Sequence, residues 1–177
     1  MSARRARALL SCALIAGCGS TSVVNRRDET ATFERYESFT IESGPITTDD
    51  AVTAGPNQLA QRRVNESIGT EMAAKGLAPA KPEDADLIVT YSASERDRQE
   101  LVRGREGPVI GTFSGTDLWV QDYREALLVI DVIDPVSQKI VWRSTARGLN
   151  QTFRDPEFVR KTVTEALTGF PQAAAKE

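Results

Sequence analysis

The residue whose chemistry is easiest to infer from its surroundings is Cys18. It follows Leu14-Ile15-Ala16-Gly17, an aliphatic pair and two small residues, and this order resembles the lipobox of bacterial lipoproteins. In that motif the small residues let a signal peptidase reach the backbone and the thiol accepts diacylglycerol. Cleavage then frees an amine for a further acyl chain such as palmitate. The spacing therefore predicts that Cys18 is acylated.

The residues before Cys18 have the composition of a secretory signal. Arg4, Arg5 and Arg7 form a basic segment, and residues 8–16 form an apolar segment that is shorter than the roughly 20 residues of a transmembrane helix. We expect residues 1–17 to be a signal peptide and residues 18–32, which are polar, to be the lipidated N-terminus and a flexible tether.

Other interpretations of this N-terminal region are open. An ordinary signal peptide with a chance cysteine and a twin-arginine signal are the two alternatives to a lipoprotein signal. Gly19 stands where an inner-membrane retention signal typically has aspartate. The sequence therefore favours the periplasmic face of the outer membrane, with the outer leaflet of the inner membrane as the alternative.

The remaining residues offer little to a catalytic site. The chain has no histidine, which excludes histidine-based triads and histidine-liganded zinc. Cys12 lies in the signal and Cys18 is committed to lipid, so we expect no disulfide. No G-x-S-x-G or P-loop motif occurs. We predict that the protein is not an enzyme and has no catalytic residues, metal site or cofactor.

Carboxylates are the groups with which this chain could still do chemistry, as glycoside hydrolases do. Asp131 stands among apolar residues, where burial would raise its pKa. Pairing of Asp131 with Arg143 or with a backbone group is the alternative that we favour. Two further acidic groups are better explained as solvated loops than as catalytic or metal sites: Asp49 with Asp50, and Glu83 with Asp84 and Asp86.

Length and composition predict one ordinary globular domain. The chain has 177 residues, of which 40% are hydrophobic, enough for a single hydrophobic core. Its net charge is −3 and its isoelectric point is near 5.2. This balance gives no electrostatic support for a nucleic-acid partner.

The hydrophobic pattern predicts an α+β fold. Strands are expected at residues 33–41, 86–93, 127–133 and 139–147, and helices at residues 57–75 and 155–170. We expect a two-layer sandwich in which a mainly antiparallel sheet of about four strands is packed by two helices. The domain would cover residues 33–171, followed by a disordered tail at residues 172–177.

The last two predicted strands organise the fold. Residues 127–133 are almost continuously apolar, so we expect them to be buried on both faces. Residues 139–147 alternate, with Ile140, Trp142 and Ala146 facing inward. We predict that Ile130 lies opposite Trp142 across a five-residue connection, residues 134–138.

Residues 94–117 differ from the segments on either side, because they are long, charge-mixed and interrupted by glycine. We predict a loop outside the core that carries recognition. The side chains expected to make contacts are Val109, Ile110 and Phe113, with Arg96, Arg98, Arg103 and Arg105 as cations.

Several of these features together resemble the bacterial lipoprotein family filed as domain of unknown function 4136. The resemblance covers roughly residues 32–171. It includes an aromatic first strand, the helix end Lys75-Gly76-Leu77, the strand Asp86-Leu87-Ile88-Val89 and, most specifically, residues 123–148. The family often has Gly-Thr where this chain has Glu125-Ala126. The resemblance implies an envelope lipoprotein without established activity or site residues.

We therefore expect a membrane-anchored envelope lipoprotein that faces the periplasm as a noncatalytic binding or scaffolding module. Its partners would be the membrane, through Cys18, and an unidentified envelope protein, lipid or glycan. A carboxylate enzyme acting on cell-wall glycans is one alternative, which two converging carboxylates in a pocket would favour. A carrier with a deep apolar groove for a ligand is the other.

Overall fold

A computed structural model describes residues 21–48, 54–103 and 118–173 of the chain. The strands are β1 (Thr21–Arg27), β2 (Ser38–Glu42), β3 (Ile46–Thr48), β4 (Ala78–Pro79), β5 (Leu87–Arg103), β6 (Leu118–Asp134) and β7 (Lys139–Leu149). The helices are the 3-10 turn η1 (Phe33–Arg35), α1 (Ala54–Ala74) and α2 (Pro156–Ala166).

The strands form one seven-stranded sheet with the order β1-β7-β6-β5-β2-β4, and β3 also pairs with β5. The pairs β1–β7, β7–β6 and β6–β5 are antiparallel, whereas β2 and β3 run parallel to β5, and β4 runs parallel to β2. The fold is α+β with two helices and the sheet is mostly antiparallel, but the expectation of about four strands is wrong because the sheet has seven strands, three of which pair in parallel. The strands that were not predicted are short or polar, and they form because a neighbouring strand offers free backbone groups rather than through an apolar pattern of their own.

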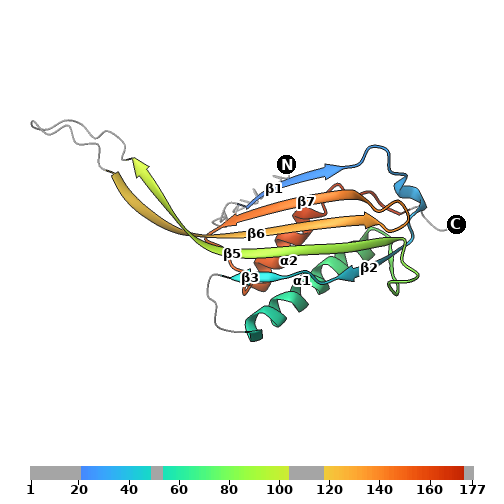
Figure 1. The fold of residues 1–177 in the computed structure, drawn as a ribbon, viewed down its shortest axis with the longest axis horizontal. Helices are drawn as coiled ribbons and strands as arrows, with labels where there is room; N and C mark the ends of the chain where they lie inside the picture. Colours follow the sequence, from blue (N-terminus) through green and yellow to red (C-terminus); the bar gives the residue numbers. More distant parts are fainter. Residues whose placement is uncertain (1–20, 49–53, 104–117, 174–177) are drawn as a thin grey trace, which may run out of the picture.

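Both helices cover the same face of the sheet (Figure 1). The predicted stripe of α1 is confirmed, since Ala60, Val64, Ile68 and Met72 are all buried. Helix α1 ends as predicted at Gly76, which has φ +88°, and the N–H of Leu77 returns to the carbonyl of Met72 at 3.2 Å.

Helix α2 begins where its capping residues predict. The Asp155 side chain accepts a hydrogen bond from the N–H of Glu157 at 2.9 Å, and Pro156 is the first helical residue. Neither helix of the described part has the length and hydropathy needed to cross a membrane.

Strand β6 is buried on one face only, which corrects the prediction of burial on both. Ala126, Leu128, Ile130 and Val132 are buried, and the residues between them are only half-buried. The reason is that neither helix of the described residues lies over the opposite face, which we name the open face. The sequence pattern of β6 cannot report how many layers pack on the sheet.

The register of the β6–β7 hairpin also differs from the prediction. Val132, not Ile130, lies opposite Trp142, and Ile133 lies opposite Ile140. Val141 has no partner in β6 and forms a β-bulge, so it is buried together with Trp142, while Ile140 is 40% exposed instead of facing inward. The shift is two residues, which preserves the inward orientation of Trp142.

The segment expected to be a tether contains strand β1. Thr21 to Arg27 pair with Gly148 to Trp142 of β7, and Asn25 donates to the carbonyl of Thr168 at 3.0 Å. At the other end of the chain, residues 172–173 belonged to the predicted disordered tail. Instead, the N–H of Ala173 donates to the carbonyl of Lys75 at 2.8 Å.

The largest departure is the predicted loop at residues 94–117. Residues 94–103 continue β5 and are paired with β6 as far as Arg103 opposite Leu118; residues 104–117 lie outside the described part. The outer halves of the two strands leave the sheet as a long projection (Figure 1). They show no period-two pattern because no other layer of the described domain buries one of their faces.

Candidate functional site

The candidate site lies on the projection, which we name the arm. The arm consists of residues 97–103 of β5 and 118–124 of β6. Strand β7 ends at Leu149 opposite Glu125, and beyond that row β5 and β6 pair only with each other. At about 3.4 Å per residue, the paired part of the arm is ~20 Å long. Two-stranded ribbons are only marginally stable alone, so the root of the arm must hold it.

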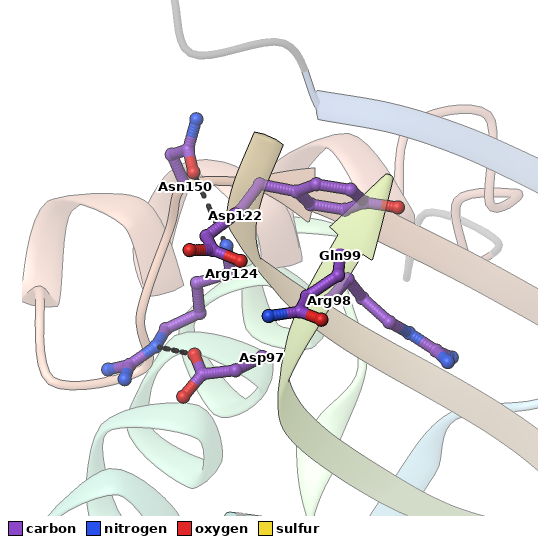
Figure 2. A pocket seen from close by; sticks show the side chains of 7 residues that line it. Asp97, Arg98, Gln99, Asp122, Arg124 and Asn150 are labelled. Carbon is purple, nitrogen blue, oxygen red and sulfur yellow. Dashed lines mark hydrogen bonds and ion pairs between the residues drawn. The ribbon is translucent and has the colours of Figure 1, made fainter. Parts of the chain in front are cut away.

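The root of the arm is fixed by polar contacts on one side, as Figure 2 shows. Arg124 Nε lies 3.0 Å from Asp97 Oδ1, which joins the two strands by an ion pair. Asn150 receives a hydrogen bond from the Arg124 N–H on its side-chain oxygen at 3.3 Å and donates its own N–H to the Arg124 carbonyl at 2.7 Å. Asn150 has φ +56°, a conformation that asparagine tolerates better than most residues. Asn150, which directly follows β7, therefore fixes the backbone of Arg124, the β6 residue of the arm that lies nearest the sheet.

The open face of the root is held by Glu125, whose side chain is 12% exposed. Its carboxylate lies 3.3 Å from Arg98 Nε and 3.1 Å from Arg147 Nε. One acidic side chain thereby connects β5, β6 and β7. Arg98, expected to be a free cation for a partner, is engaged within the domain.

Glu95 shows that the predicted recognition segment begins inside the core. It is 5% exposed and accepts hydrogen bonds from the Thr152 hydroxyl at 2.9 Å and from the Phe153 N–H at 2.5 Å. These bonds attach the link before α2 to the sheet. The prediction that the whole of residues 94–117 lies outside the core is therefore wrong for Glu95.

A hollow of about 810 Å³ lies against the root of the arm (Figure 2). Its lining residues are Asp97, Arg98, Gln99, Asp122, Tyr123, Arg124 and Asn150. It brings two carboxylates, Asp97 and Asp122, to one place, but the side chain of Asp97 is 63% exposed and ion-paired with Arg124. The general acid of a glycosidase lies in an apolar pocket, whereas Asp97 is exposed to solvent and paired with a cation.

Farther out, the arm exposes an apolar pair. Leu101 and Val120 lie opposite each other and are 64% and 58% exposed. No side chain of the described residues covers them. Of the contact residues predicted from the sequence, Val109, Ile110, Phe113 and Arg105 lie outside the described part.

Asp131 is not a catalytic candidate in this geometry. Both of its carboxylate oxygens are 2.6 Å from the Arg143 guanidinium, which confirms the pairing that we favoured. The pair lies across β6 and β7 on the open face. The hydrogen bond and the charge of Asp131 raise the pKa of Arg143.

Asp134 is a buried carboxylate whose role the sequence showed only in part, as the residue that opens a turn. It is 2% exposed and accepts hydrogen bonds from the N–H groups of Val136 and Ser137 at 2.9 and 3.3 Å. Tyr36 Oη donates to it at 3.2 Å, and Arg35 pairs with it. Burial acts to raise the pKa of Asp134, but these hydrogen bonds outweigh burial and hold the pKa below its ordinary value.

The predicted acidic loop before β5 has a structural role. Asp86 accepts hydrogen bonds from the N–H groups of Glu37 and Ser38, each at 3.0 Å, and from the Ser38 hydroxyl at 2.8 Å. These bonds lower the pKa of Asp86 against the effect of burial. Residues 21–48, 54–103 and 118–173 contain no cluster of acidic, histidine or cysteine side chains that could hold a metal. Asp49 and Asp50 lie outside them.

Comparison with solved structures identifies relatives of this fold. A DUF4136 family protein from Bacteroides thetaiotaomicron is 14% identical, with 84% of this chain and 95% of that chain covered and a TM-score of 0.54. A PDZ domain protein from Parabacteroides distasonis is 15% identical over 89% of this chain and 37% of that chain, with a TM-score of 0.54. PelC from Paraburkholderia phytofirmans, solved as a dodecamer, is 12% identical over 88% of this chain and 100% of that chain, with a TM-score of 0.51. At such identities the likeness is one of fold.

Sequence comparison gives the family. No curated protein matches the chain. The family model described as "Domain of unknown function (DUF4136)" matches residues 23–172, which include every strand and helix except the first two residues of β1. The chain belongs to the DUF4136 family.

Proposed function

We propose that this protein is a lipid-anchored envelope protein that faces the periplasm from the outer membrane and binds or scaffolds a partner through its arm. The anchor is Cys18, in the setting Leu14-Ile15-Ala16-Gly17-Cys18. Multiple acyl chains give stable attachment where a single chain would not. Strand β1 begins three residues later, so the domain would stand close to the membrane.

The observation that carries the binding role is the arm itself. Beyond Asp97 and Arg124, no other strand of the described residues pairs with the ribbon, so its edges offer backbone groups to a partner. The ribbon also exposes Leu101 and Val120 on the same row. The root of the arm is held by the Asp97–Arg124 pair and Glu125. Such a fixed scaffold under an exposed extension suits recognition.

The two alternatives have less support in the described residues. The carboxylate pair in the hollow includes Asp97, which is exposed and paired with an arginine, and Asp131 is paired with Arg143. A carrier would need a deep apolar groove, whereas six of the seven residues that line the hollow at the arm are charged or carry amides. We therefore favour a noncatalytic role.

Shortening the arm tests the binding role. Residues 99–122 would be replaced by Asn-Gly, which joins Arg98 to Tyr123 through a two-residue turn and keeps Glu95 and the Asp97–Arg124 pair. We expect the variant to fold with a melting temperature within a few degrees of the parent. In intact cells, crosslinking followed by mass spectrometry should then lose the partner found with the full arm.

A point-variant pair sharpens this test. Leu101→Ser with Val120→Ser removes the apolar pair, and Val136→Ser removes a 90% exposed side chain at the β6–β7 turn as a matched control. Only the arm variant should lose crosslinks. Retention of the same partner by the shortened arm would place recognition elsewhere. Because PelC is described as a dodecamer, a second copy of this chain is one of the partners to look for.

A further inference from the structure

The place where the lipid anchor joins the domain limits how the domain can sit on a membrane. Cys18 is three residues before Thr21, the first residue of β1. Three residues span at most about 11 Å. If Cys18 is acylated, which is part of the proposed function, Thr21 lies within that distance of the membrane surface.

Thr21 lies on a row of the sheet that crosses the middle of β5. The row runs from Thr21 to Gly148, Ala126 and Glu95. Glu95 is the midpoint of β5 (Leu87–Arg103), which extends about 27 Å to either side of it at 3.4 Å per residue. Figure 1 shows β1 starting near the middle of the long axis, with the arm on one side and the helices on the other.

An upright orientation is therefore excluded. If the long axis stood perpendicular to the membrane, about 16 Å of one half would enter the bilayer, roughly half of its ~30 Å hydrocarbon core. The arm half contains Arg98 and Glu100, and the other half contains Lys139 and Asp28, which are costly to place in hydrocarbon. The reach of the anchor and the length of β5 keep the long axis within about 25° of the membrane plane.

From this geometry we infer that the arm lies along the phospholipid surface and that Leu101 and Val120 contact it, which holds the arm where its edges can meet the partner of the proposed function. The two side chains share a row and are the large aliphatic residues that the structure shows as exposed among the arm residues whose side chains it describes. The other arm side chains that the structure describes include both signs of charge, with Asp97, Glu100 and Asp122 beside Arg98 and Arg124. The contact is thus apolar and shallow, at the level of the headgroups, where the edges of the ribbon still bond to water.

Single-cysteine labelling tests this inference directly. Cys12 is in the signal and Cys18 carries lipid, so Leu101→Cys, Val120→Cys and Gln121→Cys would each supply one free thiol in the processed protein. Gln121 is the matched control because it is exposed, neighbours Val120 and projects from the opposite face of the ribbon. Each acylated protein is labelled with an environment-sensitive fluorophore and placed in vesicles of phosphatidylethanolamine and phosphatidylglycerol.

We expect lipid-borne nitroxide to quench the labels at Leu101 and Val120 at least twofold more than the label at Gln121, and aqueous iodide to show the reverse order. Vesicle binding should be insensitive to salt. Equal quenching of the three labels would overturn the inference. Labels at Leu101 and Val120 that are already shielded from iodide in detergent, without vesicles, would overturn it too, because a second copy of the chain would then cover the pair. A protein that carries no lipid on Cys18 would instead refute the proposed function.

Discussion

Trp142 joins three parts of the fold, so its truncation is the most informative test of the core. It is 4% exposed, and its ring lies edge-on to Phe170 with centroids 5.6 Å apart. Its Nε1 donates to the carbonyl of Ala166 at 3.3 Å. Phe170 in turn packs edge-on against Phe33, with centroids 5.5 Å apart, which connects β7 and the end of α2 to η1.

We expect Trp142→Ala to lower the free energy of unfolding by about 3–5 kcal/mol, because a large buried ring is lost and a cavity remains. Trp142→Phe keeps a ring beside Phe170 but leaves the Ala166 carbonyl without its donor, which should cost about 1–3 kcal/mol. In a double-mutant cycle, Trp142 and Phe170 should show a coupling of about 0.5–1.5 kcal/mol.

Urea unfolding followed by far-ultraviolet circular dichroism measures these changes without relying on tryptophan fluorescence. Ile140→Ser is the matched control, since the bulge at Val141 turns Ile140 toward solvent. It should cost less than about 1 kcal/mol. If Trp142→Ala is near-neutral, or if Ile140→Ser is as costly as Trp142→Ala, the bulge and the register are wrong.

Three further predictions address single contacts. Asp134→Asn should lower the free energy of unfolding by about 1–3 kcal/mol at pH 7. Because the pKa of Asp134 is lowered in the fold, the stability that its carboxylate contributes is complete above the ordinary pKa of about 3.9 and is lost as pH falls through the lowered pKa. The urea midpoint should therefore fall less between pH 5 and pH 2 in the variant than in the parent. Gly44→Ala should cost about 1–3 kcal/mol in the same assay, since a Cβ there would lie 1.5 Å from the Tyr91 carbonyl oxygen; an unchanged midpoint would contradict this approach of the two backbones. Asp131→Asn should change stability by no more than about 1 kcal/mol, because its partner Arg143 is 46% exposed; a loss of several kcal/mol would mean that the open face is covered.

The helices were predictable because their signals are local. Asp155 followed by Pro156 marks the start of α2, and Gly76 followed by Leu77 marks the end of α1. Each signal acts through hydrogen bonds within one turn. The pairing of Asp131 with Arg143 was also foreseeable, since opposite charges stand at compatible positions of two strands.

The strands that were missed depend on neighbours distant in sequence. Residues 21–27 are mostly exposed and polar, and they form β1 because the edge of β7 is available. The arm lacks an apolar period since no other layer of the described domain covers either of its faces. Val141 carries no sign of being a bulge, yet it shifts the register by changing which residues pair.

The location of the arm in the sequence was predictable, but its strand structure and its contacts were not. The sequence marks a long, unusual segment after residue 94, where the structure has the arm, and the role of this segment in recognition stays a prediction. What could not be read was that Glu95 is bonded to Thr152 and Phe153, or that Arg98 is occupied by Glu125. Those partners come from β6 and from the link before α2, and only the fold brings them together.

The measurement that most directly tests the account is the chemical state of Cys18 in the protein purified from membranes. Mass spectrometry of the N-terminal tryptic peptide, which would run from Cys18 to Arg26, should find it beginning at Cys18 and carrying a diacylglyceryl group and a further acyl chain. Globomycin should cause the unprocessed precursor to accumulate, and a Cys18→Ser protein should leave the membrane fraction. An N-terminus at another residue, or an unmodified Cys18 in the membrane-bound protein, would contradict the anchor and with it the orientation inferred for the arm.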